Sequence, residues 1–139
     1  MKTITTIDYI VRNTWLKIAK MYNNEASKFN STMVNGFTLL SIDPKTGTPS
    51  TKLGPKMGIQ PTSLSRTIKN LEELKLIERI PSRTDKRSVI IKLTPQGLLK
   101  RNISKQIVLN FNDKVINAVS KEDLEAFVRV AEAIQKLED

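Results

Sequence analysis

The stretch from Ile59 to Gly97, "IQPTSLSRTIKNLEELKLIERIPSRTDKRSVIIKLTPQG", decides the fold because its hydrophobic period changes along the chain. Its first half has Leu64, Ile68 and Leu71 three or four residues apart, which predicts one buried edge of a helix. Pro61 suits the first helical position, where a missing N–H costs nothing. The pattern predicts a helix over residues 61–74, with Leu74 expected to join the buried edge.

The second half of the stretch changes to the alternation that is typical of strands. Ile77 to Ile80 form one predicted strand and Ser88 to Thr94 the other, with Val89, Ile91 and Leu93 on one face. Between them lies "SRTDKR", Ser82 to Arg87, which is longer than a two-residue turn. We therefore expect a β-hairpin with a projecting, charged tip.

Shorter elements are expected before this stretch. "STMVNGFTLLSI" (31–42) predicts a short buried helix, and "DPKTGTPS" (43–50) predicts a loop because of its prolines and glycine. A further short helix is expected over 50–58, ending near Gly54 or Gly58, with Pro55 inside it.

Long amphipathic helices are expected at both ends. The apolar residues of roughly 5–29 recur every three or four positions, and a second apolar face widens the stripe. Thr94 and Pro95 are expected to begin a helix that runs to about 118. Ser120, with Asp123 three residues on, predicts the cap of a last helix that extends to about 138. These helices carry more apolar surface than one small domain covers, which predicts a dimer.

The composition excludes several classes of protein. The length of 139 residues is typical of a single domain, and the sequence includes no Cys and no His. Disulfides, thiolate metal sites and His-based catalytic triads are therefore impossible. Because no phosphate loop, nucleophile motif or carboxylate spacing for a metal is present, we expect no enzyme, no metal and no cofactor. The chain shows neither a signal peptide nor a membrane-spanning run, so a cytoplasmic protein with no membrane partner is expected.

The positive charge is concentrated in the middle of the chain. The whole chain has a net charge of +9, and residues 50–105 alone carry +9, against +3 for residues 1–49 and −3 for 106–139. A central basic segment on a helix and a hairpin favours a polyanionic partner.

The order of a short helix, a turn, a helix with a polar outward face and a charged hairpin is that of a winged helix-turn-helix. The second helix of this motif enters the major groove of DNA, and the hairpin, or wing, reaches the neighbouring backbone or minor groove. The residues expected to contact DNA lie on the helix, on the wing and on the preceding helix: Thr62, Ser63, Ser65, Arg66 and Lys69; Arg83, Asp85, Lys86 and Arg87; and Lys52 and Lys56. Asp85 is expected to hold Arg87 or Arg83 in one pose.

These motifs resemble the MarR family of bacterial winged-helix regulators. The similar segments are "LG…MGIQPTSLSRTIKNLEELKLIER", then "DKR" in the wing, then "LTPQG" before the long helix, and the order of helices is similar over nearly the whole chain. The resemblance implies a single MarR-like domain over 1–139. Within it, about 31–94 form the DNA-binding part, and about 5–29 and 95–138 form the dimerisation helices.

The resemblance also implies how such a protein works. It implies a homodimer on a pseudo-palindromic operator, a small-molecule effector, Arg87 as the minor-groove arginine and Asp85 as the residue that orients it. Members usually have glycine where Lys75 stands, so Lys75 must take up a left-handed backbone or the helix must end in another way. The absence of Cys excludes the thiol-oxidation form of the family's regulation.

Two other functions are compatible with the sequence. A winged-helix module whose basic wing binds an acidic protein would have the same charge distribution. An enzyme fits less well, because His and Cys are absent.

Overall fold

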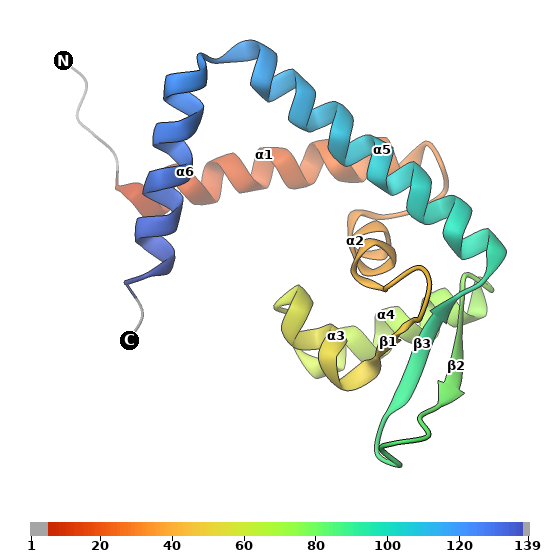
Figure 1. The fold of residues 1–139 in the computed structure, drawn as a ribbon. Helices are drawn as coiled ribbons and strands as arrows, with labels where there is room; N and C mark the ends of the chain where they lie inside the picture. The colour runs from red at the N-terminus through yellow and green to blue at the C-terminus, as the bar shows by residue number, and fades with distance from the viewer. Residues whose placement is uncertain (1–5, 138–139) are drawn as a thin grey trace. The chain divides into compact units, whose positions relative to one another are not determined.

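A computed structural model describes residues 6–137 and shows a mainly helical chain with one small sheet (Figure 1). The elements in chain order are α1 (Ile7–Ser27), α2 (Met33–Ser41), β1 (Thr48–Pro49), α3 (Ser50–Met57), α4 (Pro61–Glu73), β2 (Ile77–Pro81), β3 (Val89–Leu93), α5 (Pro95–Ala118) and α6 (Lys121–Gln135). The predicted fold class, a winged helix-turn-helix flanked by terminal helices, is confirmed.

Helix α4 has the predicted buried edge but ends earlier than expected. Leu64, Ile68 and Leu71 are buried, whereas Leu74 is 51% exposed, so its predicted burial is wrong. The reason is the turn that follows, in which Lys75 has a φ of 62°. The Leu76 N–H donates to the Leu71 carbonyl at 3.0 Å, and the Lys75 N–H donates to that of Glu72 at 2.9 Å. This left-handed ending places Leu76, rather than Leu74, in the core.

The sheet contains one strand more than the sequence predicted. Its order is β1-β3-β2, with both neighbours antiparallel to β3. Strand β2 pairs along its length with β3, from Ile77 opposite Leu93 to Pro81 opposite Val89. The segment 43–50 was predicted to be a loop throughout, but Thr48 and Pro49 pair with Ile91 and Ile90. Pro49 lacks an N–H and is tolerated there because β1 is an edge strand.

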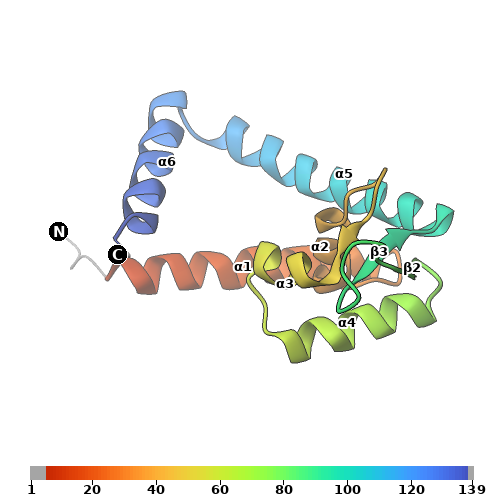
Figure 2. The ribbon, with the colours of Figure 1, turned by 60° about the horizontal axis from the view of Figure 1, so that its bottom comes forward.

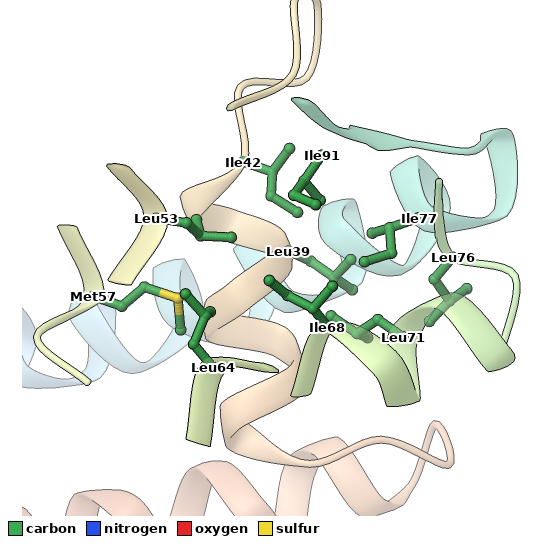
Figure 3. Close-up of a cluster of buried hydrophobic side chains, with 10 residues drawn as sticks. All are labelled: Leu39, Ile42, Leu53, Met57, Leu64, Ile68, Leu71, Leu76, Ile77 and Ile91. Carbon is green, nitrogen blue, oxygen red and sulfur yellow. The ribbon is translucent and has the colours of Figure 1, made fainter. Parts of the chain in front are cut away.

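The core lies between α2, α3, α4 and the sheet (Figure 3). Leu39 and Ile42 come from α2 and the residue after it, Leu53 and Met57 from α3, and Ile91 from the central strand. The remaining members come from α4, the turn after it and the start of β2: Leu64, Ile68, Leu71, Leu76 and Ile77. The side chains of α4 that point into this cluster determine which of its faces is left for a partner.

The end of α4 is joined tightly to the start of α5. Thr94 caps α5 as predicted, since its hydroxyl accepts from the Gly97 N–H at 3.0 Å. The same hydroxyl donates to the Lys75 carbonyl at 2.7 Å, and the Thr94 N–H donates to the Leu76 carbonyl at 3.0 Å. A Cβ on Gly97 would lie 1.9 Å from the Leu76 oxygen, so only glycine fits at this position.

The terminal helices appear where they were predicted. Helix α1 covers residues 7–27 of the expected 5–29, and residue 5 lies outside the described part of the chain. Ser120 caps α6 by accepting from the Asp123 N–H at 3.1 Å, and α6 ends at Gln135 rather than near 138. By its internal contacts the chain divides into two compact units, one up to Lys105 and one from Gln106, so the division falls within α5. The expectation of a single domain stays a prediction.

Candidate nucleic-acid interface

The outward face of α4 carries the five residues that the sequence predicted to contact DNA. Thr62, Ser63, Ser65, Arg66 and Lys69 are all exposed. Their side chains make no hydrogen bond or ion pair within residues 6–137, which leaves the donors of Arg66 and Lys69 available to a partner. The opposite edge is held by Leu64, Ile68 and Leu71 in the core, so this face cannot turn inward.

The first turn of α4 offers further donors. Gln60 precedes the helix, and no side chain caps the first turn among the residues described. The Leu64 N–H donates to the Gln60 carbonyl at 3.0 Å, whereas the N–H groups of Thr62 and Ser63 have no intrahelical acceptor. An uncapped helix N-terminus favours negative charge, and a phosphate supplies it.

Strand β2 packs against α4 (Figure 2). An ion pair joins the two elements, with Arg79 Nε 3.1 Å from Glu72 Oε1. Arg79 is therefore occupied within the protein, whereas Arg83, Lys86 and Arg87 extend from the tip of the hairpin as exposed side chains.

The wing tip, Ser82 to Arg87, is held by its own side chains. The Ser82 hydroxyl accepts from the N–H groups of Thr84 and Asp85 at 3.3 and 3.1 Å. The Ser88 N–H donates to the Asp85 carbonyl at 3.1 Å, which closes the turn. Sequence reasoning missed this role of Ser82, although a serine that begins a turn just ahead of an aspartate is a recognisable signal.

Asp85 contacts Arg87 in two ways. Its Oδ1 accepts from the Arg87 N–H at 2.9 Å and lies 3.6 Å from Arg87 Nε. The Arg87 side chain is 92% exposed and that of Asp85 is 45% exposed. The structure thus brings together the pair that the sequence suggested, and Arg87 rather than Arg83 is the partner of Asp85. The carboxylate also holds the backbone of the tip, which the sequence did not suggest.

The two lysines of α3 have different surroundings. Lys52 is exposed and makes no side-chain hydrogen bond or ion pair in the described part of the chain. Lys56 donates from Nζ to the Ser41 carbonyl at 2.7 Å, so its charge is directed at the end of α2. The sequence grouped these lysines together because spacing along α3 does not reveal a contact with α2.

Helices α3 and α4, the three-residue connection between them and the projecting hairpin define a winged helix-turn-helix protein with helical extensions. Residues 32–89 match the sequence model of the MarR family. The predicted resemblance to this family is confirmed, in sequence over that segment and in fold over nearly the whole chain.

Solved structures share the fold at low sequence identity. A DNA complex of MepR from S. aureus has a TM-score of 0.86 and 20% identity, covering 96% of this chain and 100% of MepR. The reduced form of MarR from E. coli has a TM-score of 0.80 and 19% identity, covering 96% and 98%. PcaV from Streptomyces coelicolor, in complex with its natural ligand, has a TM-score of 0.82 and 14% identity, covering 100% of both chains.

Proposed function

We propose that the chain is a dimeric, sequence-specific DNA-binding transcriptional regulator. In this proposal α4 enters the major groove, with Arg66 or its neighbours contacting base edges. The wing tip reaches the adjacent minor groove, with Arg87 as the inserted side chain. The proposal includes a cytoplasmic location and no enzymatic activity.

One observation carries most of the proposal. The outward face of α4 and the wing tip present exposed basic side chains from adjacent elements, and the N–H groups of the first turn of α4 are uncapped. Two parts of an interface that differ in shape, a convex helix and a projecting arginine, match the two grooves of duplex DNA. The DNA-bound relative MepR, with the same fold, supports this reading.

Selection of bound duplexes from a random pool tests the proposal directly. We expect the pool to converge on a pseudo-palindrome whose half-sites lie about one helical turn apart. Binding to all duplexes alike would contradict sequence specificity, and binding to an acidic protein in preference to DNA would favour the alternative of a protein-interaction module. Within residues 6–137 no helix has the length and apolar character needed to span a membrane.

Large apolar side chains on the terminal helices support a homodimer. In the first unit, Trp15 is 51% exposed, and Leu16 and Val11 are exposed beside it on α1. In the second unit, Phe127 is 65% exposed, with Val130 and Ile134 also exposed on α6. Surfaces of this kind are normally covered by a partner. Sedimentation equilibrium should give twice the mass of the chain, and deletion of residues 1–20 should give a monomer or an insoluble product.

A small-molecule effector is part of the proposal. An effector that binds one arrangement of the dimer better than another shifts the spacing of the two α4 helices and thereby changes affinity for the operator. PcaV, which has the same fold, has been solved in complex with its natural ligand, and this supports the proposal that an effector binds here too. A screen for small molecules that raise the melting temperature and weaken operator binding would identify it.

A further inference from the structure

Lys56 makes a contact that a DNA-binding lysine would not need. Its Nζ donates to the carbonyl of Ser41, the last residue of α2, at 2.7 Å. The last carbonyls of a helix have no intrahelical donor. Ser41 is only 5% exposed, so water has little access to this residue. Helix α2 has no basic residue in its last turn, and Lys56 therefore supplies the positive charge that favours a helix C-terminus.

The contact joins α2 to the first helix of the DNA-binding motif. Helix α3 is anchored on either side of it by Leu53 and Met57, both members of the core. Gly54 in α3 lies against α4, since a Cβ placed on it would be 3.3 Å from Leu64 Cδ2. Because α3 and α4 are packed this closely, a shift of α3 relative to α2 would be passed on to the first turn of α4.

We infer that Lys56 is a positioning residue that holds α3, and through it α4, against the end of α2, rather than a residue that contacts DNA. The inference rests on the proposed function and refines it by removing one lysine from the predicted phosphate contacts. Lys52, one turn earlier on α3 and without a side-chain partner in the described residues, remains a phosphate-contact candidate.

Three variants of the full-length protein separate the two roles. Lys56→Met keeps much of the side chain but removes both the charge and the donor, and Lys56→Arg keeps both. Lys52→Met is the matched control, because it removes the same charge from the same helix, and the Lys52 side chain makes no hydrogen bond or ion pair among the described residues. For each, we would measure affinity for the selected operator and for a random duplex across a range of salt concentrations, together with thermal unfolding.

A positioning role predicts a specific pattern. Lys56→Met should weaken operator binding on the order of tenfold, the size of effect seen for substitutions that act through a packed network. Its affinity for the random duplex and its salt dependence should stay close to those of the original protein. Its melting temperature should fall by about 2–6 °C. Lys56→Arg should restore both properties. Lys52→Met should instead reduce the slope of log affinity against log salt by about 0.9 on both duplexes.

Other outcomes overturn the inference. If Lys56→Met weakens both duplexes equally, lowers the slope by about 0.9 and leaves the melting temperature unchanged, then Lys56 contacts phosphate. If the original protein binds neither duplex, the proposed function fails, and the unfolding data still test the contact with α2. In that case an unchanged melting temperature for Lys56→Met would show that the contact holds nothing in place.

Discussion

Replacing Asp85 by alanine tests whether the wing acts through its charge or through its geometry. Asp85 is the only acidic residue in the wing tip, so its removal makes the tip more basic. If charge alone matters, the variant should bind DNA more tightly. If Asp85 serves to hold Arg87, the variant should bind more weakly although its positive charge has increased.

The two effects differ in size as well as in sign. A carboxylate about 8 Å from a phosphate repels it by roughly 0.5 kcal/mol in water. Screening at physiological salt reduces this to about 0.2 kcal/mol, so loss of Asp85 through charge alone should tighten binding less than twofold. Freeing Arg87 restores rotamer entropy that DNA binding must then remove, up to about 1.5–2 kcal/mol for an arginine. Orientation therefore predicts binding that is weaker by up to roughly ten- to thirtyfold.

Loss of the ion pair between Asp85 and Arg87 should hardly change the stability of the free protein. Arg87 Nε and Asp85 Oδ1 are 3.6 Å apart, and the Arg87 side chain is 92% exposed. An exposed pair of this kind contributes about 0–1 kcal/mol to the free energy of unfolding. Loss of the pair should therefore appear in operator affinity, measured by fluorescence anisotropy. Asp85→Ala also loses the hydrogen bond from the Arg87 N–H, so its melting temperature should fall by a few degrees.

Asp85→Asn separates the two contacts that this carboxylate makes. Asparagine can still accept from the Arg87 N–H, the bond of 2.9 Å that holds the backbone of the tip, but it has no charge for the guanidinium. If the backbone contact is what matters, Asp85→Asn should bind as tightly as the original protein. If the charged side-chain pair matters, it should bind as weakly as Asp85→Ala.

A double-mutant cycle gives the refutation. Arg87→Ala should weaken binding further, and adding Asp85→Ala to it should have little additional effect because the two residues act as a unit. Tighter binding by Asp85→Ala, or full additivity in the double variant, would show that the wing tip is a diffuse basic patch.

Four further predictions concern single positions. Lys75→Gly should raise the free energy of unfolding in urea by roughly 0.5–1 kcal/mol. Lys75 has a φ of 62°, and this left-handed backbone costs a non-glycine residue about 1–2 kcal/mol, a cost that is partly offset by the greater entropy of glycine in the unfolded chain. A less stable variant would contradict this. Gly97→Ala should lower the free energy of unfolding by about 3 kcal/mol or more, because its Cβ would lie 1.9 Å from the Leu76 oxygen. Gly58→Ala is the control: no atom lies within 4 Å of its new Cβ, so its free energy of unfolding should fall by only about 1–2 kcal/mol, through its φ of 67°. The N–H groups of Thr46 and Lys45 donate to the Asp43 carboxylate and lower its pKa, so Asp43 stabilises the fold fully above its unfolded pKa of about 4 and loses this effect as the pH falls through its folded pKa. The difference in melting temperature between the original protein and Asp43→Ala should therefore shrink between about pH 6 and about pH 3. A constant difference would exclude this role. Arg66→Ala should cost on the order of 1–3 kcal/mol of operator binding and relax the preference at one base, while Lys69→Ala should weaken all duplexes alike and reduce the salt slope by about one; the register of α4 is wrong if neither variant changes binding.

The parts of the fold that could be predicted from sequence are those fixed by local periodicity and turn chemistry. The spacing of Leu64, Ile68 and Leu71 set both the buried edge of α4 and, by exclusion, its outward face. Thr94 and Ser120 were recognisable as caps because the residues that follow them favour helix starts, and their hydroxyls accept the expected N–H groups.

The parts that were missed depend on contacts between distant residues. Strand β1 is two residues long, and Pro49 pairs with Ile90, some forty positions away, so no local pattern marks it. Leu74 fits the helical period but follows the last helical residue. Because the backbone of Lys75 is left-handed, Leu76 is buried in the core and Leu74 is exposed. Lys52 and Lys56 look alike in sequence, and only the position of the Ser41 carbonyl distinguishes them.

The joint between α4 and α5 has a consequence for how such a protein diversifies. Its hydrogen bonds end on the main-chain carbonyls of Lys75 and Leu76, and the outward side chains of α4 take no part in it. If α4 enters the major groove as proposed, substitutions at Thr62, Ser65 and Arg66 would change which bases are recognised while the support of the helix stays intact. Gene duplication followed by drift at these positions would generate new operator preferences on an unchanged scaffold, and the same positions are the natural ones to randomise when the protein is retargeted in the laboratory.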